Sequence, residues 1–144
     1  MNCPLGHGAL QPETHGAIAV QACSSCGGEW LAHETLAGLE ASAVGDSTVL
    51  AGMVEYQPNQ SDLPCPVCEK PMYEFDYRGN PLELNACELG HGYWLDGGEE
   101  SRVRELMRQR ARDLHRSAAA EGSFGSFLNG IRGQLGGRGG KSRR

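Results

Sequence analysis

The chain has 144 residues, 21 glycines, an aromatic content of 6% and a formal net charge of −5. So few bulky side chains argue against one large apolar core and favour very small units, which rarely fold without a metal ion, disulfides or a partner. No apolar run reaches the roughly 18 residues of a membrane span, and the N-terminal MNCPLGHGAL does not resemble an export signal. We therefore expect a cytoplasmic protein without a membrane span, whose paired cysteines are ligands.

An internal repeat appears when the chain is aligned with itself at a shift of 62 to 64 positions. Cys3 then falls on Cys65, and Trp30-Leu31 falls on Trp94-Leu95. The first unit has a C-x3-H pair followed by a C-x2-C pair, and the second unit has the same two pairs in the opposite order. The two pairs of each unit therefore supply three cysteines and one histidine.

Three thiolates and one imidazole form the four-ligand set that a structural zinc ion prefers. The candidate ligands are Cys3, His7, Cys23 and Cys26 in the first unit, and Cys65, Cys68, Cys87 and His91 in the second. Disulfides would leave both histidines unexplained, and three cysteines cannot all pair within one unit. The pattern predicts two zinc ions per chain, with disulfides and other metals as the alternatives.

One further histidine could compete for the first site. His15 lies near the expected turn of the first hairpin, so its side chain should be at the far end from the ligands. The C-x3-H spacing therefore favours His7 as the ligand.

Period-2 alternation between the ligand pairs predicts β-hairpins. Ile18, Val20 and Ala22 follow the turn THG in the first unit. The second unit has two such runs around the turn RGN, and their alternating residues are Tyr73, Phe75 and Tyr77, then Leu82, Leu84 and Ala86. Each unit is thus expected to be a ligand turn, a β-hairpin and a second ligand turn, which is a zinc ribbon.

The segments CPLGH...CSSCGGEWLAHE and CPVC...CELGHGYWLDGGEE resemble the TFIIB-like zinc-ribbon family, in two tandem copies covering about residues 3–41 and 65–107. The resemblance implies the zinc-ribbon fold and the same eight ligands, and the family name implies transcription. Two departures stand out: histidine replaces cysteine at different corners of the two units, and Ala32 stands where the second unit has Asp96.

A helix is expected after each ribbon. The first, HETLAGLEASAV, has an apolar edge at Leu36 and Leu39 and a stop at Gly45. The second is expected over about residues 97–116, with Asp96 as N-cap, Glu99 completing a capping box, and an apolar stripe that packs on a ribbon. The residues of that stripe are Val103, Leu106, Met107 and Leu114.

These elements predict a small metal-stabilised α+β protein in four segments. They are a first ribbon with a short helix at 1–44, a linker at 45–64, a second ribbon with a long basic helix at 65–116, and a flexible basic tail at 117–144. Within the linker TVLAGMVEY is expected to be partly ordered and QPNQSDLP to be a loop. The Gly- and Ser-rich tail still places apolar residues at helical intervals, namely Phe124, Phe127, Leu128, Ile131 and Leu135.

Charge is divided unevenly along the chain. Residues 1–100 hold 15 acidic residues against Lys70 and Arg78, a net charge of −13, and residues 101–144 carry +8. Acidic ribbons would repel a phosphate backbone, so nucleic acid could be met only by the basic stretch 102–144. The pattern therefore favours self-association or a protein partner over nucleic acid.

The sequence thus predicts a zinc-binding, non-catalytic macromolecular-interaction protein, a transcription-associated or regulatory adaptor in the light of the resemblance. Nucleic-acid binding through the basic helix and tail is the alternative. An iron–sulfur or redox protein is the third hypothesis, because C-x3-H also occurs in some cluster sites. We find no catalytic constellation, and the pair His33-Glu34 is not the H-E-x-x-H motif of a metalloprotease.

Overall fold

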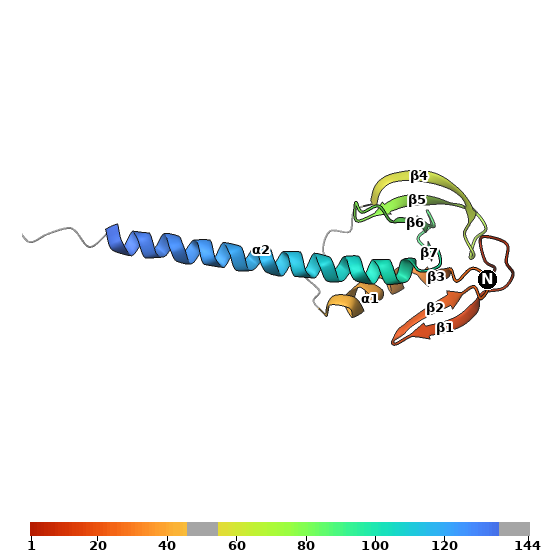
Figure 1. Cartoon of the computed structure of the whole chain (residues 1–144). Coiled ribbons are helices and arrows are strands. Elements are labelled where there is room, and N and C mark those ends of the chain that lie inside the picture. Colours follow the sequence, from red (N-terminus) through yellow and green to blue (C-terminus); the bar gives the residue numbers. More distant parts are fainter. Residues whose placement is uncertain (46–54, 136–144) are drawn as a thin grey trace, which may run out of the picture.

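The computed structural model describes residues 1–45 and 55–135, which form one antiparallel sheet and two helices. The helix α2 begins on the body and then projects away from it as a long rod (Figure 1). In chain order the elements are β1 (Gln11–His15), β2 (Ile18–Ala22), β3 (Glu29–Ala32), α1 (His33–Val44), β4 (Glu55–Pro64), β5 (Pro71–Tyr77), β6 (Glu83–Ala86), β7 (Gly92–Leu95) and α2 (Glu99–Leu135).

The two repeats share a single sheet. Its strand order is β1-β2-β3-β7-β6-β5-β4, so the two units meet where β3 pairs with β7. Trp30 lies opposite Trp94, with Glu29 opposite Leu95 on one side and Leu31 opposite Tyr93 on the other. In the repeat alignment Glu29 corresponds to Tyr93 and Leu31 to Leu95, so the two flanking pairs are equivalent. An approximate two-fold axis through the tryptophan pair therefore relates the repeats.

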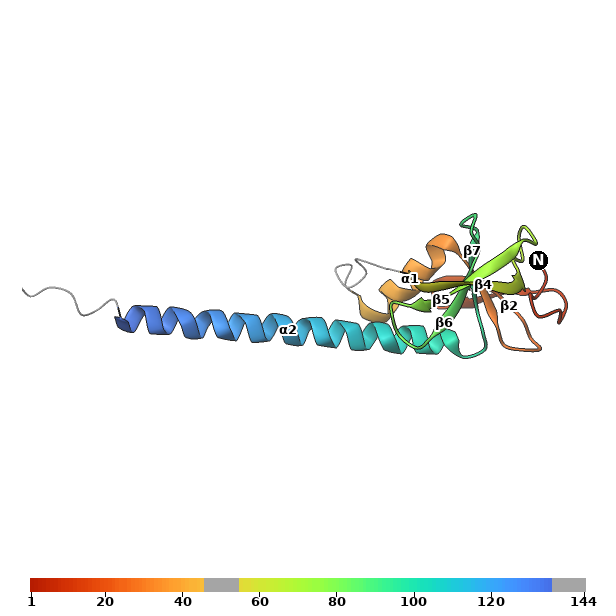
Figure 2. The same ribbon diagram turned by 90° about the horizontal axis from the view of Figure 1, so that it is seen from above.

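The two faces of the sheet differ because successive side chains of a strand point to opposite sides. On one face, β3 and β7 contribute Leu31, Tyr93 and Leu95 to the main apolar core. Both helices cover that core, as the view from above also shows (Figure 2). Their buried residues are Leu36 and Leu39 of α1, and Val103 and Met107 of α2. The opposite face holds a second cluster, in which Trp30 and Trp94 pack with cysteines of both units.

The expected hairpins and the first helix are confirmed. The alternating residues of β2 and β6 are buried, and so are Phe75 and Tyr77 of β5. Helix α1 ends where Gly45 adopts the left-handed conformation at φ 68°, and its N–H donates to the Ala41 carbonyl at 2.8 Å. The expected α+β class is therefore confirmed.

The interpretation of QPNQSDLP as a loop is wrong, because these residues belong to β4, which pairs with the outer edge of β5. Prolines are tolerated on an edge strand, where a missing N–H breaks no central ladder. Register shifts between Tyr56 and Asn59 and between Gln60 and Pro64 absorb the irregularity. Of TVLAGMVEY, residues 48–54 lie outside the described residues.

The second helix differs from its expected bounds. It begins at Glu99 and continues to Leu135, well beyond residue 116. Three successive alanines, residues 118–120, favour the helical conformation at the point where a flexible tail was expected. The apolar stripe is confirmed for Val103, Leu106 and Met107, which pack on the core, whereas Leu114 is 43% exposed. Residues 136–144 lie outside the described part of the chain.

Candidate metal centres

Four short turns carry the eight candidate ligands, and all four close in the same way. In each turn the N–H of the first cysteine donates to the carbonyl five residues later. The pairs are Cys3 with Gly8, Cys23 with Gly28, Cys65 with Lys70, and Cys87 with Gly92, at 2.8 to 3.0 Å. Turns closed by the same hydrogen bond therefore carry both the C-x3-H pairs and the C-x2-C pairs.

The position of the left-handed residue distinguishes the two kinds of turn. In the C-x3-H turns it is Gly6 or Gly90, three residues after the cysteine and directly before the histidine. In the C-x2-C turns it is Gly27 or Glu69, four residues after the first cysteine and directly after the second. Because the closing bond is unchanged, the two pairs can exchange places between the repeats without changing the fold.

The first group joins the start of the chain to the turn between β2 and β3. The Cys3 sulfur lies 3.7 Å from His7 Nδ1 and 3.8 Å from the Cys26 sulfur. The ligand atoms of Cys3, His7, Cys23 and Cys26 all lie within 4.8 Å of one another.

The second group joins the turn between β4 and β5 to the turn between β6 and β7. His91 Nδ1 lies 3.4 Å from the Cys87 sulfur and 3.9 Å from the Cys65 sulfur, and the Cys68 and Cys87 sulfurs are 3.7 Å apart. The structure therefore brings together all eight residues predicted from the sequence, in the two predicted sets.

These separations fit a tetrahedral metal ion. Zinc–sulfur bonds of about 2.3 Å at tetrahedral angles place ligand atoms about 3.8 Å apart. A disulfide requires its sulfurs to be about 2 Å apart, and all six cysteines are unpaired. Both groups could therefore hold a metal ion, and the identity of that metal stays a prediction.

Backbone hydrogen bonds and burial act in opposite directions on the thiols. Hydrogen bonding from the Cys26 N–H lowers the pKa of Cys23 to about 6, whereas burial raises the pKa of Cys26 and of Cys65 to about 11. Burial also acts to raise the pKa of Cys87, but the N–H groups of His91 and Leu89 outweigh it and the pKa is lowered. A bound divalent cation would favour the thiolate at every position.

The two tryptophans pack between the metal groups. Trp30 is 3% exposed and Trp94 is fully buried, and both belong to the cluster that contains Cys3, Cys65 and Cys87. The Trp94 indole N–H donates to Asp96 Oδ1 at 2.9 Å. Asp96 thus fixes the indole, and its own N–H donates to the Glu99 carboxylate at 2.8 Å, which is one of the two side-chain hydrogen bonds of the expected capping box. The Glu99 N–H donates to the Asp96 backbone carbonyl instead of its side chain.

His15 and His33 lie away from the metal groups. His15 is at the end of β1, and its Nε2 lies 2.8 Å from a carboxylate oxygen of Glu29. His33 begins α1 and stacks on Tyr93 with 5.5 Å between ring centroids. Neither histidine belongs to a predicted ligand set.

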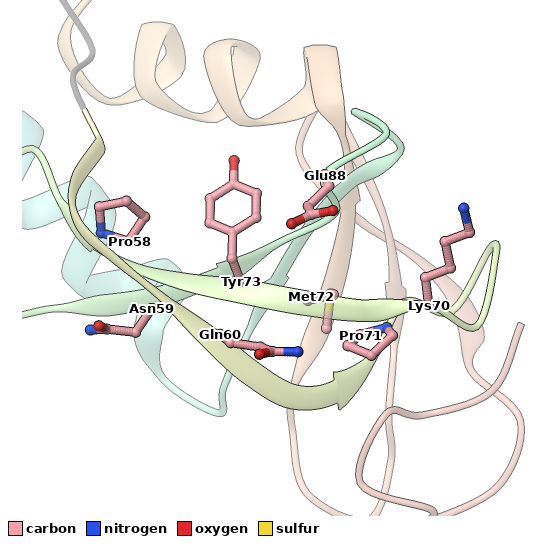
Figure 3. Close-up of a pocket in the computed structure, with 8 residues that line it drawn as sticks. All are labelled: Pro58, Asn59, Gln60, Lys70, Pro71, Met72, Tyr73 and Glu88. Carbon is pink, nitrogen blue, oxygen red and sulfur yellow. The ribbon is translucent and has the colours of Figure 1, made fainter.

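A cavity of about 720 Å³ lies beside the second metal group (Figure 3). Tyr73 and Glu88 project to the same side of the sheet there, and Lys70 extends from the adjacent turn. The remaining lining residues are Pro58, Asn59, Gln60, Pro71 and Met72. These residues do not include a nucleophile paired with a base, so the cavity does not have the composition of a hydrolytic active site.

Two arginines of α2 contact the body through polar groups that carry no charge. Arg102 donates to the Pro81 carbonyl at 3.0 Å, and Arg104 donates to the Ser42 hydroxyl at 2.7 Å. Arg104 also pairs with Glu100, while Arg108 and Arg112 pair with Glu105, so these ion pairs lie within α2.

A buried polar contact between the repeats has no counterpart in the sequence analysis. Glu40 of α1 is 3% exposed, and its carboxylate accepts hydrogen bonds from the Tyr77 hydroxyl and from Arg78 Nε. The partners are 37 and 38 residues apart, so local periodicity could not identify them. The nearest signal of this contact in the sequence is Glu40 itself, a charged residue next to the apolar edge that Leu36 and Leu39 form in the expected helix.

No helix in residues 1–45 and 55–135 has the length and apolar character needed to cross a membrane. The resemblance to the TFIIB-like zinc-ribbon family stays a prediction. Comparison with models of known families, with curated proteins and with solved structures finds no match to this chain.

Proposed function

We propose that this protein is a non-catalytic interaction scaffold whose sheet is stabilised by two structural zinc ions. The observation that carries the proposal is the composition of each metal group, with three thiolates and one imidazole at tetrahedral distances. Four protein ligands leave no open position at which a metal-bound water could react, so the metal would act structurally. The residues that would hold zinc are the four ligands of each group.

The metal content of the purified chain tests the proposal. Elemental analysis should find about two zinc per chain, and the protein should be colourless. His7→Gln should lower the zinc content by about one, whereas His15→Gln should retain both ions, because His15 contacts Glu29 instead. Iron in place of zinc, or equal effects of the two substitutions, would contradict the assignment.

Exposed apolar residues at the tips of the ligand turns support a protein partner. Leu5, Val67 and Leu89 each lie two residues after the first cysteine of their turn, and they are 45 to 58% exposed. The surrounding residues 1–100 carry a net charge of −13. A protein surface with small apolar pockets and basic residues around them would complement these tips.

Tip variants test this choice. Replacing Leu5, Val67 and Leu89 together by Ser should abolish partner capture from a lysate while two zinc ions remain bound. Ser25 occupies the same position in the fourth turn, so Ser25→Ala is a matched control and should keep the partner. A triple variant that retains the same partner would argue against the tips.

The resemblance extends the proposal to a transcription-associated or regulatory adaptor. Nucleic-acid binding through α2 and the tail is a second candidate, which the net charge of +8 in residues 101–144 favours. We rank it lower because Arg104, Arg108 and Arg112 already pair with acids of the same helix. Binding that falls steeply with salt and is lost on removal of residues 117–144 would reverse this order.

A further inference from the structure

The outer part of α2 exposes large apolar side chains. Phe124 and Phe127 are 63% and 62% exposed and Leu128 is 49% exposed, whereas the third phenylalanine of the chain, Phe75, is 1% exposed in the core. Positions three and four residues apart share one face of a helix, so these three side chains form a single patch. We call Phe124, Phe127 and Leu128 the distal patch.

The opposite side of this segment is small and polar. At 100° per residue, Gly122 and Ser126 lie away from the distal patch, with Ser123 flanking them. A Cβ added at Gly122 or Gly125 would have no atom within 4 Å, so no part of the body covers this side. The segment is therefore an amphipathic helix with bulky residues on one side only.

Its composition favours a covering surface. Each glycine costs a helix about 1 kcal/mol relative to alanine, and the outer part of α2 contains Gly122, Gly125, Gly130 and Gly133. Residues 112–128 are all exposed, so contacts with the body do not compensate for that cost. Burial of the distal patch against an apolar layer would offset the cost of the glycines.

Charge indicates the kind of layer. After Glu121 the chain has five basic residues and no acidic one, namely Arg132, Arg138, Lys141, Arg143 and Arg144. A sheet of anionic lipid headgroups complements this charge, and each basic residue near such a surface contributes about 1 kcal/mol. Two parallel copies of the helix would instead bring like charges together.

We propose that the outer part of α2 binds the surface of an anionic membrane, with the distal patch inserted at the interface and the helix lying along it. The segment does not cross the bilayer. This binding is independent of the metal groups, which lie at the other end of the molecule (Figure 1). The proposal adds a lipid surface to the protein partner of the scaffold.

Vesicle flotation of the full zinc-loaded chain tests the proposal. The chain should float with vesicles of three parts phosphatidylcholine to one part phosphatidylglycerol, less so in about 0.5 M NaCl, and weakly with phosphatidylcholine alone. The double variant F124S/F127S should bind the anionic vesicles about tenfold less or weaker still, because two aromatic rings leave the interface.

The double variant A118S/A119S is the matched control, since these positions lie on the small side of the same helix and binding should persist. Both variants should retain the parent's zinc content, which separates failure here from failure of the scaffold proposal. Absence of parent binding to anionic vesicles, or equal binding by F124S/F127S, would overturn the inference. A second outcome would also overturn it. If the parent chain forms a dimer without lipid in ultracentrifugation and the F124S/F127S variant is monomeric, a second copy covers the distal patch.

Discussion

Gly28 packs directly against the indole of Trp94, so closely that a Cβ at position 28 would lie 2.3 Å from the Cζ2 atom of the ring. The equivalent contact occurs in the other direction, where a Cβ at Gly92 would lie 2.9 Å from Cζ2 of Trp30. Each repeat thus provides the glycine that admits the tryptophan of the other repeat. The paired glycines and tryptophans allow β3 and β7 to join at the two-fold axis.

Gly92→Ala should destabilise the body severely. The new methyl group would meet the Leu31 carbonyl oxygen at 2.1 Å, which is backbone of the paired strand and cannot move aside alone. The φ of 153° adds strain for any side chain. We expect a loss of about 3 kcal/mol or more in the free energy of unfolding, measured by denaturant titration of the zinc-loaded protein.

Gly125→Ala is the control for that substitution. Gly125 lies in exposed α2 with nothing within 4 Å of an added Cβ, so alanine should increase helicity and leave the body as stable as before. Equal losses from the two alanines would mean that the contact at the β3–β7 junction does not limit stability.

Removal of one metal site should affect both repeats. Cys65→Ser deletes a ligand of the second group, but β3 and β7 pair in one sheet and both helices cover one core. We therefore expect zinc loss to lower the melting temperature of the whole body in a single transition. Calorimetry with parallel zinc analysis measures this.

The comparison variant is Ser24→Ala, which is not a predicted ligand and should leave one transition at the parent's temperature. Two separate transitions in Cys65→Ser, one of them unchanged, would show that the repeats fold independently.

Glu40→Ala should destabilise the contact between α1 and the β5–β6 turn. The substitution removes the carboxylate that accepts from Tyr77 and from Arg78, whose side chain is only 6% exposed. Loss of one partner from a buried ion pair costs about 3 to 5 kcal/mol. Glu34→Ala, at an exposed position of the same helix, should change the unfolding free energy by less than about 0.5 kcal/mol.

Glu99 should make stability depend on pH. Burial raises its pKa to about 7 in the folded protein, against the contrary effect of the hydrogen bond from the Asp96 N–H. The neutral form of the Glu99 carboxyl therefore favours the folded state. Its contribution to folding stability is fully present below the unfolded pKa of about 4.3 and is lost as the pH rises through about 7.

Glu99→Gln removes this titration and keeps an oxygen that can accept from Asp96. We expect the variant and the parent to have similar stability near pH 5, and the variant to be more stable at pH 8. After allowance for partial solvent exposure the difference should be about 1 kcal/mol. Unfolding titrations at both pH values measure it, and a constant difference across the range would contradict the raised pKa.

Several features could be predicted from the sequence because their causes are local. The two groups of eight candidate ligands followed from the spacing of Cys and His on short turns, and the end of α1 followed from Gly45. The loop assigned to QPNQSDLP was wrong for the opposite reason. Prolines and polar residues disfavour a strand locally, but the open edge of β5 supplies the partner that forms β4.

The end of α2 shows a similar limit. Glycines and serines suggested that the chain leaves the helix near Arg116, whereas the helix continues through the alanines and the distal patch. Hydrogen bonds within a helix propagate from an existing turn at little cost, so a start at the capping box carries the helix further than composition implied.

By itself the sequence determined the composition of the candidate ligand groups, the hairpins and the contact of Asp96 with Glu99 at the start of α2, because each depends on residues close together in the chain. Only the tertiary structure decided that the repeats form one sheet about an axis between Trp30 and Trp94, and that Glu40 meets Tyr77 and Arg78. These arrangements depend on residues far apart in the chain. Close packing and the burial of polar groups select such contacts, and neither has a periodicity that a single sequence displays.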